Sequence, residues 1–94
     1  MTALDFIDKA IAIAQDRYRR IPAFEVYTSV LNQLYFIKAI LEKRETDKAR
    51  LHDLTLGAIA VKEFEETDPE LCEALKDAFY IADQIARGLK VQLP

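Results

Sequence analysis

Apolar and polar residues follow one another along this chain with the period of an amphipathic α-helix. In the first stretch, Leu4, Ile7, Ile11 and Ala14 recur at intervals of three or four residues, which places them on one helical face. The same spacing returns in three later stretches, each separated from the last by a short polar segment. The pattern predicts helices over about residues 3–20, 24–43, 47–65 and 69–87, followed by a short tail at 88–94.

Capping signals mark the ends of the first and last predicted helices. Thr2 is a favourable N-cap residue, and Asp5 three residues later completes a capping box in which Asp replaces Glu. Gly88 directly follows the last periodic stretch, where a glycine adopts the left-handed conformation that ends many helices. These local signals predict both helix ends without reference to the hydrophobic pattern.

The corner from Thr67 to Glu70 is the clearest local signal in the sequence. With Asp68 as the N-cap, Pro69 occupies the first helical position, where its missing N–H does no harm. Thr67 with Glu70 forms an alternative capping box at the same place. Either choice predicts that the last helix begins near residue 69.

The third predicted helix, 47–65, is apolar on more than one side. Gly57 lies in its interior, where glycine costs about 1 kcal/mol relative to alanine. We therefore expect a close helix crossing at Gly57. The main apolar face of this helix consists of Leu51, Leu54, Ala58 and Val61.

Short loops between the helices favour antiparallel neighbours. The predicted fold is therefore all-α, an antiparallel up-down-up-down four-helix bundle in a single domain, 1–94. In such a bundle the first and third corners lie at the same end. Arg17, Arg19 and Arg20 then approach the acidic corner before residue 69, and an intramolecular ion-pair network is one interpretation of these charges.

Composition narrows the classes of partner and compartment. The chain of 94 residues carries a formal charge of −3 with 31% charged residues, which argues against a nucleic-acid partner because such proteins need a clustered basic face. No apolar run reaches the roughly 18–20 residues that span a bilayer, and the first residues lack the pattern of a secretory signal. With one cysteine there is no internal disulfide, so a cytoplasmic protein is expected.

The residues needed for catalysis or metal binding are missing. His52 is the only histidine, and one histidine cannot supply the paired ligands of a metal-binding bundle. Cys72 has Glu70 and Glu73 beside it, which oppose the formation of a reactive thiolate. We therefore expect no catalytic residue, no metal and no cofactor.

Acidic residues gather between the third and fourth predicted helices without an intervening Lys or Arg. Glu63, Glu65 and Glu66 lie at a helix C-terminus, where the helix dipole disfavours each by a few tenths to about 1 kcal/mol. A solvated face and a partner-binding surface are equally good interpretations of these three. Phe64 among them is either a core residue or an anchor for a partner. The full acidic set comprises Glu63, Glu65, Glu66, Asp68, Glu70 and Glu73.

The stretch from Leu54 to Tyr80 resembles a known family. The resemblance is carried by Leu54-Thr55-Leu56-Gly57, Ile59-Ala60-Val61-Lys62-Glu63-Phe64, Glu66-Thr67-Asp68-Pro69-Glu70-Leu71 and Ala74-Leu75-Lys76-Asp77-Ala78, and it continues through Arg87-Gly88-Leu89-Lys90-Val91. These segments are similar to the small all-helical immunity proteins that protect bacteria with type VI secretion from an NAD(P)+ glycohydrolase effector. A looser match in the same register covers the rest of the chain, while 42–50 and 81–86 depart from the pattern.

The resemblance implies an antitoxin without catalytic activity. It would bind the toxin domain of its cognate effector and block access to the NAD(P)+ site. The placement of charges suggests how the site would be blocked. A pocket that binds phosphates should have an electropositive mouth, and the acidic corner could occupy that mouth in place of the substrate. The aromatic residues of the second helix are the alternative contact. The predicted toxin-binding residues are Glu63, Phe64, Glu65, Glu66, Asp68, Tyr27 and Tyr35.

Two other classes of function remain open on the sequence. The apolar surface of the second and third helices would also suit a self-associating helical adaptor, and a homodimer is a further possible assembly. A small-molecule-binding bundle with a pocket between its helices is the third interpretation.

Overall fold

A computed structural model describes residues 1–94 and contains helices and loops without strands. The all-helical class predicted from the sequence is confirmed. The second helix is shorter at both ends than the predicted 24–43. The elements are α1 (Ala3–Arg20), α2 (Val26–Leu41), the 3-10 helix η1 (Lys48–Asp53), α3 (Leu56–Ile59), the π-helix η2 (Ala60–Phe64) and α4 (Pro69–Ala86).

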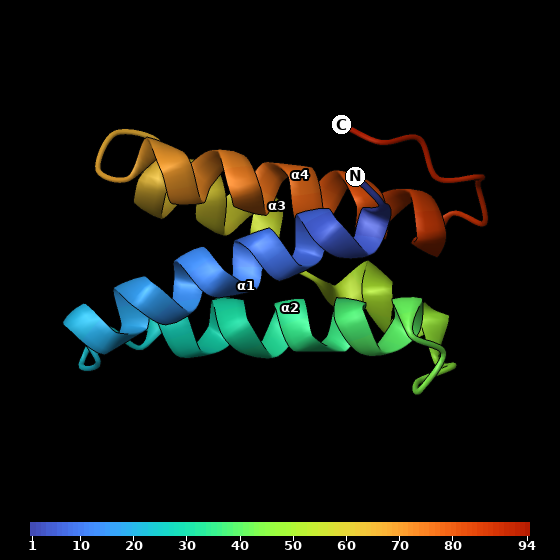
Figure 1. The fold of residues 1–94 in the computed structure, drawn as a ribbon, viewed down its shortest axis with the longest axis horizontal. Helices are drawn as coiled ribbons and strands as arrows, with labels where there is room; N and C mark the ends of the chain where they lie inside the picture. The colour runs from blue at the N-terminus through green and yellow to red at the C-terminus, as the bar shows by residue number, and fades with distance from the viewer.

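Helix α1 lies between α2 and α4 and packs against both, while α3 and η2 cover α4 on a further side (Figure 1). The buried apolar faces of these helices meet in one core. Gly57 of α3 crosses α4 closely, since a Cβ atom at this position would lie 3.1 Å from Cδ2 of Phe79. The expected close crossing is confirmed. The largest fully buried side chains are Ile7, Val30, Leu34, Ile37, Leu56, Leu71, Leu75 and Ile81.

Local signals at the two ends of the chain act as predicted. The Thr2 amide donates to Oδ2 of Asp5 at 2.7 Å, and the Asp5 amide donates to Oγ1 of Thr2 at 3.2 Å, which completes the capping box. Gly88 has a φ of 71° after α4. The tail then turns back, because the buried Gln84 side chain donates to the Gln92 carbonyl at 3.0 Å and accepts from the Gln92 amide at 2.8 Å.

Asp68 rather than Thr67 caps α4. The Leu71 amide donates to Oδ1 of Asp68 at 3.2 Å, and Pro69 occupies the first helical position. The Thr67 hydroxyl instead donates to the Glu63 carbonyl at 2.8 Å. The alternative capping box of Thr67 with Glu70 is therefore not formed.

The predicted third helix, 47–65, is wrong as one continuous element. Leu54 is extended, with a ψ of 141°, and this break separates η1 from α3 and η2. Gln33 of α2 satisfies the freed backbone, since its Oε1 accepts from the Thr55 amide at 2.8 Å. Helical winding restarts in a new register after the break, so Ala58 and Val61 of the predicted face turn to solvent. The buried positions are Leu51, Leu56, Ala60 and Phe64.

None of the helices is both long enough and apolar enough to cross a bilayer.

Candidate partner-binding surface

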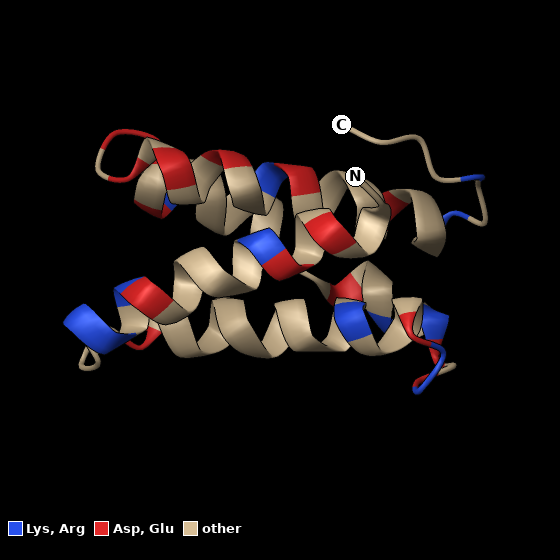
Figure 2. Ribbon diagram, in the orientation of Figure 1, with Lys and Arg blue, Asp and Glu red and all other residues tan.

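Three glutamates form an exposed acidic edge where η2 ends. This acidic edge consists of Glu63, Glu65 and Glu66, and none of the three carboxylates makes an ion pair. Glu65 and Glu66 are exposed and Glu63 is half-buried. Figure 2 shows the acidic segment before α4 at the same end of the molecule as the basic end of α1. Unpaired charge at an exposed helix end leaves the acidic edge free to meet a basic partner.

An apolar side chain and a shallow depression adjoin the acidic edge. Val61 is 52% exposed, and with Lys62, Thr67 and the three glutamates it lines a depression of about 300 Å³. Periodicity placed Val61 in the core, and no signal in the sequence marks it as exposed. Val61, Lys62 and Glu63 belong to the π-helix η2, which was not predicted from the sequence. Such helices occur frequently at functional sites.

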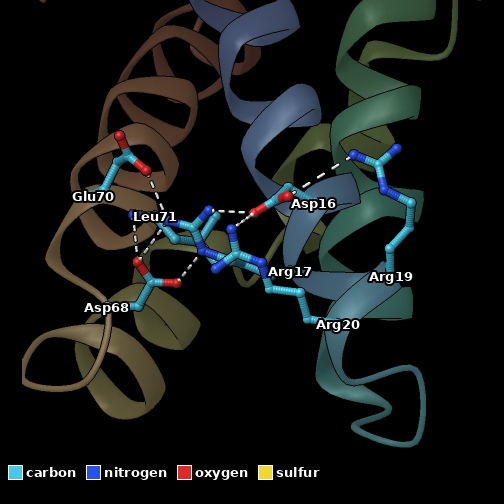
Figure 3. Close-up of polar contacts among 7 residues, drawn as sticks. All are labelled: Asp16, Arg17, Arg19, Arg20, Asp68, Glu70 and Leu71. Carbon is cyan, nitrogen blue, oxygen red and sulfur yellow. Dashed lines mark hydrogen bonds and ion pairs between the residues drawn. The ribbon is translucent and has the colours of Figure 1, made fainter.

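Arg17 forms ion pairs with two other acids of the corner, Asp68 and Glu70. Its guanidinium donates to Asp68 from Nε at 2.8 Å, to Glu70 from Nη2 at 2.7 Å and to Asp16 from Nη1 at 2.8 Å (Figure 3). The Arg17 and Asp68 side chains are only 18% and 17% exposed. The hydrogen bond from Arg17 holds the pKa of Asp68 below its ordinary value, against the opposing effect of burial. Asp68, a predicted toxin-binding residue, therefore serves as an N-cap and ion-pair partner within the fold.

The other two arginines do not reach the acidic corner. Arg20 pairs with Asp16 at 3.0 Å, and Arg19 approaches Asp16 at 3.9 Å. The predicted ion-pair network is therefore correct for Arg17 and wrong for Arg19 and Arg20. Asp16 lies three and four residues before these arginines on α1, so it competes with the distant acids for both of them. The prediction did not include this local pairing.

Tyr27 and Phe64 lie in the core rather than on the surface. Their rings stack with centroids 5.7 Å apart and planes 6° from parallel, and the edge of Phe24 meets Tyr27 at 5.2 Å. The side chains are 7% and 2% exposed, respectively. The prediction of Tyr27 as an exposed contact is wrong, because the stack between α2 and η2 covers its ring. Of the two alternatives for Phe64, the structure selects the core residue.

Tyr35 remains exposed but lies away from the acidic edge. It is 44% exposed, and its hydroxyl accepts from Nε2 of Gln15 at 2.7 Å. Eight residues separate it from Tyr27 along α2, a rise of about 12 Å. The structure therefore brings the three glutamates together with Val61 and places Tyr35 on a separate part of the surface.

The side chains that can ligate a metal ion do not gather into one site. No group of three His, Cys, Asp or Glu side chains is placed to hold a metal ion. His52 is exposed on η1, whereas Cys72 is buried at 4% exposure in α4. What the arrangement offers is a charged and partly apolar surface for binding.

The sequence model of the Tsi6 family matches residues 2–84. The chain is also 53% identical over 94 residues to immune protein Tsi6 of Pseudomonas aeruginosa (strain PAO1), with all of both chains covered. The protein therefore belongs to the Tsi6 family, which confirms the resemblance to an immunity family drawn from residues 54–80. Its similarity to an immune protein supports a binding role rather than an enzymatic one.

Solved structures support the same assignment. A chain in the structure of Tse6 in complex with Tsi6 matches this chain with a TM-score of 0.95 and 53% identity over the whole of both chains. The structure of Tsi6 from Pseudomonas aeruginosa matches with a TM-score of 0.87 and 52% identity, covering 100% of this chain and 98% of the other.

Proposed function

We propose that this protein is an immunity protein that binds the toxin domain of a cognate type VI secretion effector and blocks its NAD(P)+ site. The observation that carries the proposal is the full-length similarity to a chain in the complex of Tse6 with Tsi6, at 53% identity. The role is inhibition by binding, so it needs a complementary surface and no reacting group. The proposal places the protein in the cytoplasm, where it would protect the nicotinamide pool of the producing cell.

The acidic edge is the proposed contact. NAD(P)+ carries phosphates, so the mouth of a pocket that binds it should be electropositive. Glu63, Glu65 and Glu66 make no internal ion pair, so no salt bridge within the fold has to break before they meet such a surface. Exposed Val61 beside them supplies an apolar contact that excludes water from the charged pairs. Tyr35 is the second candidate contact.

The proposed scaffold for this surface is the up-down-up-down arrangement of a single domain, 1–94. In this arrangement the η2–α4 corner lies beside the end of α1, where Arg17 pairs with Asp68 at 2.8 Å. That ion pair fixes the segment that carries the acidic edge. A rigid edge loses less conformational entropy when it binds, which favours tight inhibition.

Co-expression tests the function. Cells that produce an NAD(P)+ glycohydrolase domain from the neighbourhood of this gene should keep their NAD(P)+ and survive when the gene is co-expressed. Failure of rescue against every neighbouring toxin domain would refute the immunity function. Formation of a complex that leaves NAD(P)+ hydrolysis unchanged would instead refute the blocking of the active site. Sedimentation of the free protein decides whether it forms a homodimer, as the alternative adaptor function requires.

A charge-neutralising triple variant tests the surface. Glu63→Gln, Glu65→Gln and Glu66→Gln together should weaken toxin binding by about 10- to 2,000-fold and flatten its salt dependence, because each rim or half-buried charge pair contributes about 0.5–1.5 kcal/mol. The matched control changes three unpaired acids outside the acidic edge, Asp47→Asn, Asp53→Asn and Glu73→Gln. Equal affinity and equal salt dependence for the two variants would exclude the acidic edge and leave Tyr35 as the contact.

A further inference from the structure

An apolar hollow lies at the ends of α2 and α4, away from the acidic edge. It has a volume of about 580 Å³, and its apolar wall consists of Ile40, Leu41, Ile85 and Val91. This volume lies in the range of pockets that bind small molecules. The immunity function proposed above makes no use of this hollow.

The C-terminal tail forms one side of the hollow and is held in place by a buried amide. Val91 belongs to the tail, and the next residue, Gln92, is bonded through both its amide and its carbonyl to the side chain of Gln84. Gln84 is 6% exposed and is the one buried polar residue of the chain. The buried Gln84 therefore holds the tail, and with it Val91, against the helices that form the rest of the apolar wall.

Two lysines line the same hollow without an acidic partner. Lys43 and Lys48 make no ion pair. The third charged residue there, Glu45, is already engaged, because its carboxylate accepts from the Thr46 and Asp47 amides at 2.9 Å and 3.0 Å. The hollow therefore combines an apolar wall with one net positive charge.

The backbone at Lys43 is strained in a way that glycine would relieve. Lys43 has a φ of 61° and is the only residue other than glycine with a positive φ. It follows the end of α2, where the left-handed conformation strongly favours glycine. A strained residue whose side chain has no partner within the fold points to a role for that side chain outside it.

We propose that this hollow binds a small aliphatic monocarboxylate, with the hydrocarbon chain against Ile40, Ile85 and Val91 and the carboxylate between Lys43 and Lys48. A single negative charge matches the net charge of the lining. A phosphate monoester would bring nearly two negative charges close to Glu45. The binding is separate from the toxin surface, and either can fail without the other.

Titration of decanoate into the ¹⁵N-labelled full-length protein tests the proposal by NMR. Saturable shifts are expected in the amides of 40–48, 85 and 91, and decanol, with the same chain and no charge, should bind at least about tenfold more weakly. Lys43→Gln with Lys48→Gln should weaken decanoate about tenfold. The control pair Lys76→Gln with Lys90→Gln makes the same charge change outside the hollow and should have no effect.

Filling the hollow from the tail gives a second and independent measurement. Val91→Trp places an indole against the apolar wall from a residue outside every helix, so the helical bundle keeps its circular dichroism and unfolding midpoint while decanoate binding is lost. Decanoate shifts that do not saturate would overturn the proposal. So would equal affinity for decanol, or unchanged binding by a folded Val91→Trp variant.

Discussion

Replacing Arg17 by methionine removes the central cation of the corner while keeping an unbranched side chain of similar length. Wild-type Arg17 donates to Asp68 at 2.8 Å and to Glu70 at 2.7 Å. The variant would leave the Asp68 carboxylate, which is only 17% exposed, without its charged partner. Asp68 still caps α4, so the change tests the ion pair rather than the cap.

The magnitude follows from the burial of the pair. An exposed ion pair contributes up to about 1 kcal/mol, whereas removing one partner of a fully buried pair costs about 3–5 kcal/mol. Arg17 and Asp68 are more than four-fifths buried, so we expect a loss of about 2 kcal/mol. For a domain of this size that lowers the melting temperature by roughly 10 °C.

Urea unfolding followed by circular dichroism measures the loss at pH 7. Asp68→Asn provides the second variant, because asparagine caps a helix as well as aspartate does and carries no charge. The double variant should cost less than the sum of the single ones by about 1–2 kcal/mol. Arg19→Met is the matched control, since Arg19 is 73% exposed, and it should change stability by less than about 0.5 kcal/mol.

The pH dependence has a defined sign. The pKa of Asp68 in the folded protein is lowered from its ordinary value of 3.8 by the hydrogen bond from Arg17. The pair therefore stabilises the fold above that ordinary value, and its contribution is lost as the pH falls through the lowered pKa. The difference between wild type and Arg17→Met should shrink in this acidic range. Additive single variants, or a stability difference that does not change with pH, would refute the ion pair as the source of the stability.

Three further changes probe other features. Lys43→Gly should stabilise the protein by about 1 kcal/mol, because glycine adopts the φ of 61° without strain; an unchanged urea midpoint would contradict this. Gln84→Ala should cost about 1–2 kcal/mol and speed hydrogen exchange at the Gln92 amide, which loses its acceptor; continued protection of that amide would show another anchor. Asp77→Asn should stabilise by less than about 1 kcal/mol at pH 7, because burial, and then Glu73, raise the pKa of Asp77 in the fold. The stability advantage of Asp77→Asn should grow as the pH rises from the ordinary value of 3.8 through the raised pKa. Equal dependence of stability on pH for the two proteins would refute this explanation.

The sequence by itself determined the features that depend on neighbouring residues. The capping box of Thr2 with Asp5, the Asp68 cap before Pro69 and the left-handed Gly88 are formed by atoms within a few positions of one another. Motifs of this kind leave their signature in the sequence because their geometry is local. The family could also be predicted from the sequence, because the resemblance rests on runs of consecutive residues between Leu54 and Tyr80.

The candidate site was only partly predictable, and its residues show why. Glu63, Glu65 and Glu66 stood out because they oppose the dipole of their own helix, a local property. Tyr27 and Phe64 gave no such signal, because an apolar ring is equally suited to the core and to an interface. Their burial depends on the stack that they form between α2 and η2, 37 residues apart in the chain, with centroids 5.7 Å apart.

Tertiary structure alone decided the break at Leu54 and which of the three arginines of α1 meets Asp68. The break is stabilised by Gln33 of α2, and Arg17 meets Asp68 across 51 residues of sequence. Such contacts depend on which helices pack together and at what level, and neither periodicity nor capping contains that information. The sequence therefore determined where most helices begin and end, whereas packing decided which of the acids remained free to bind a partner.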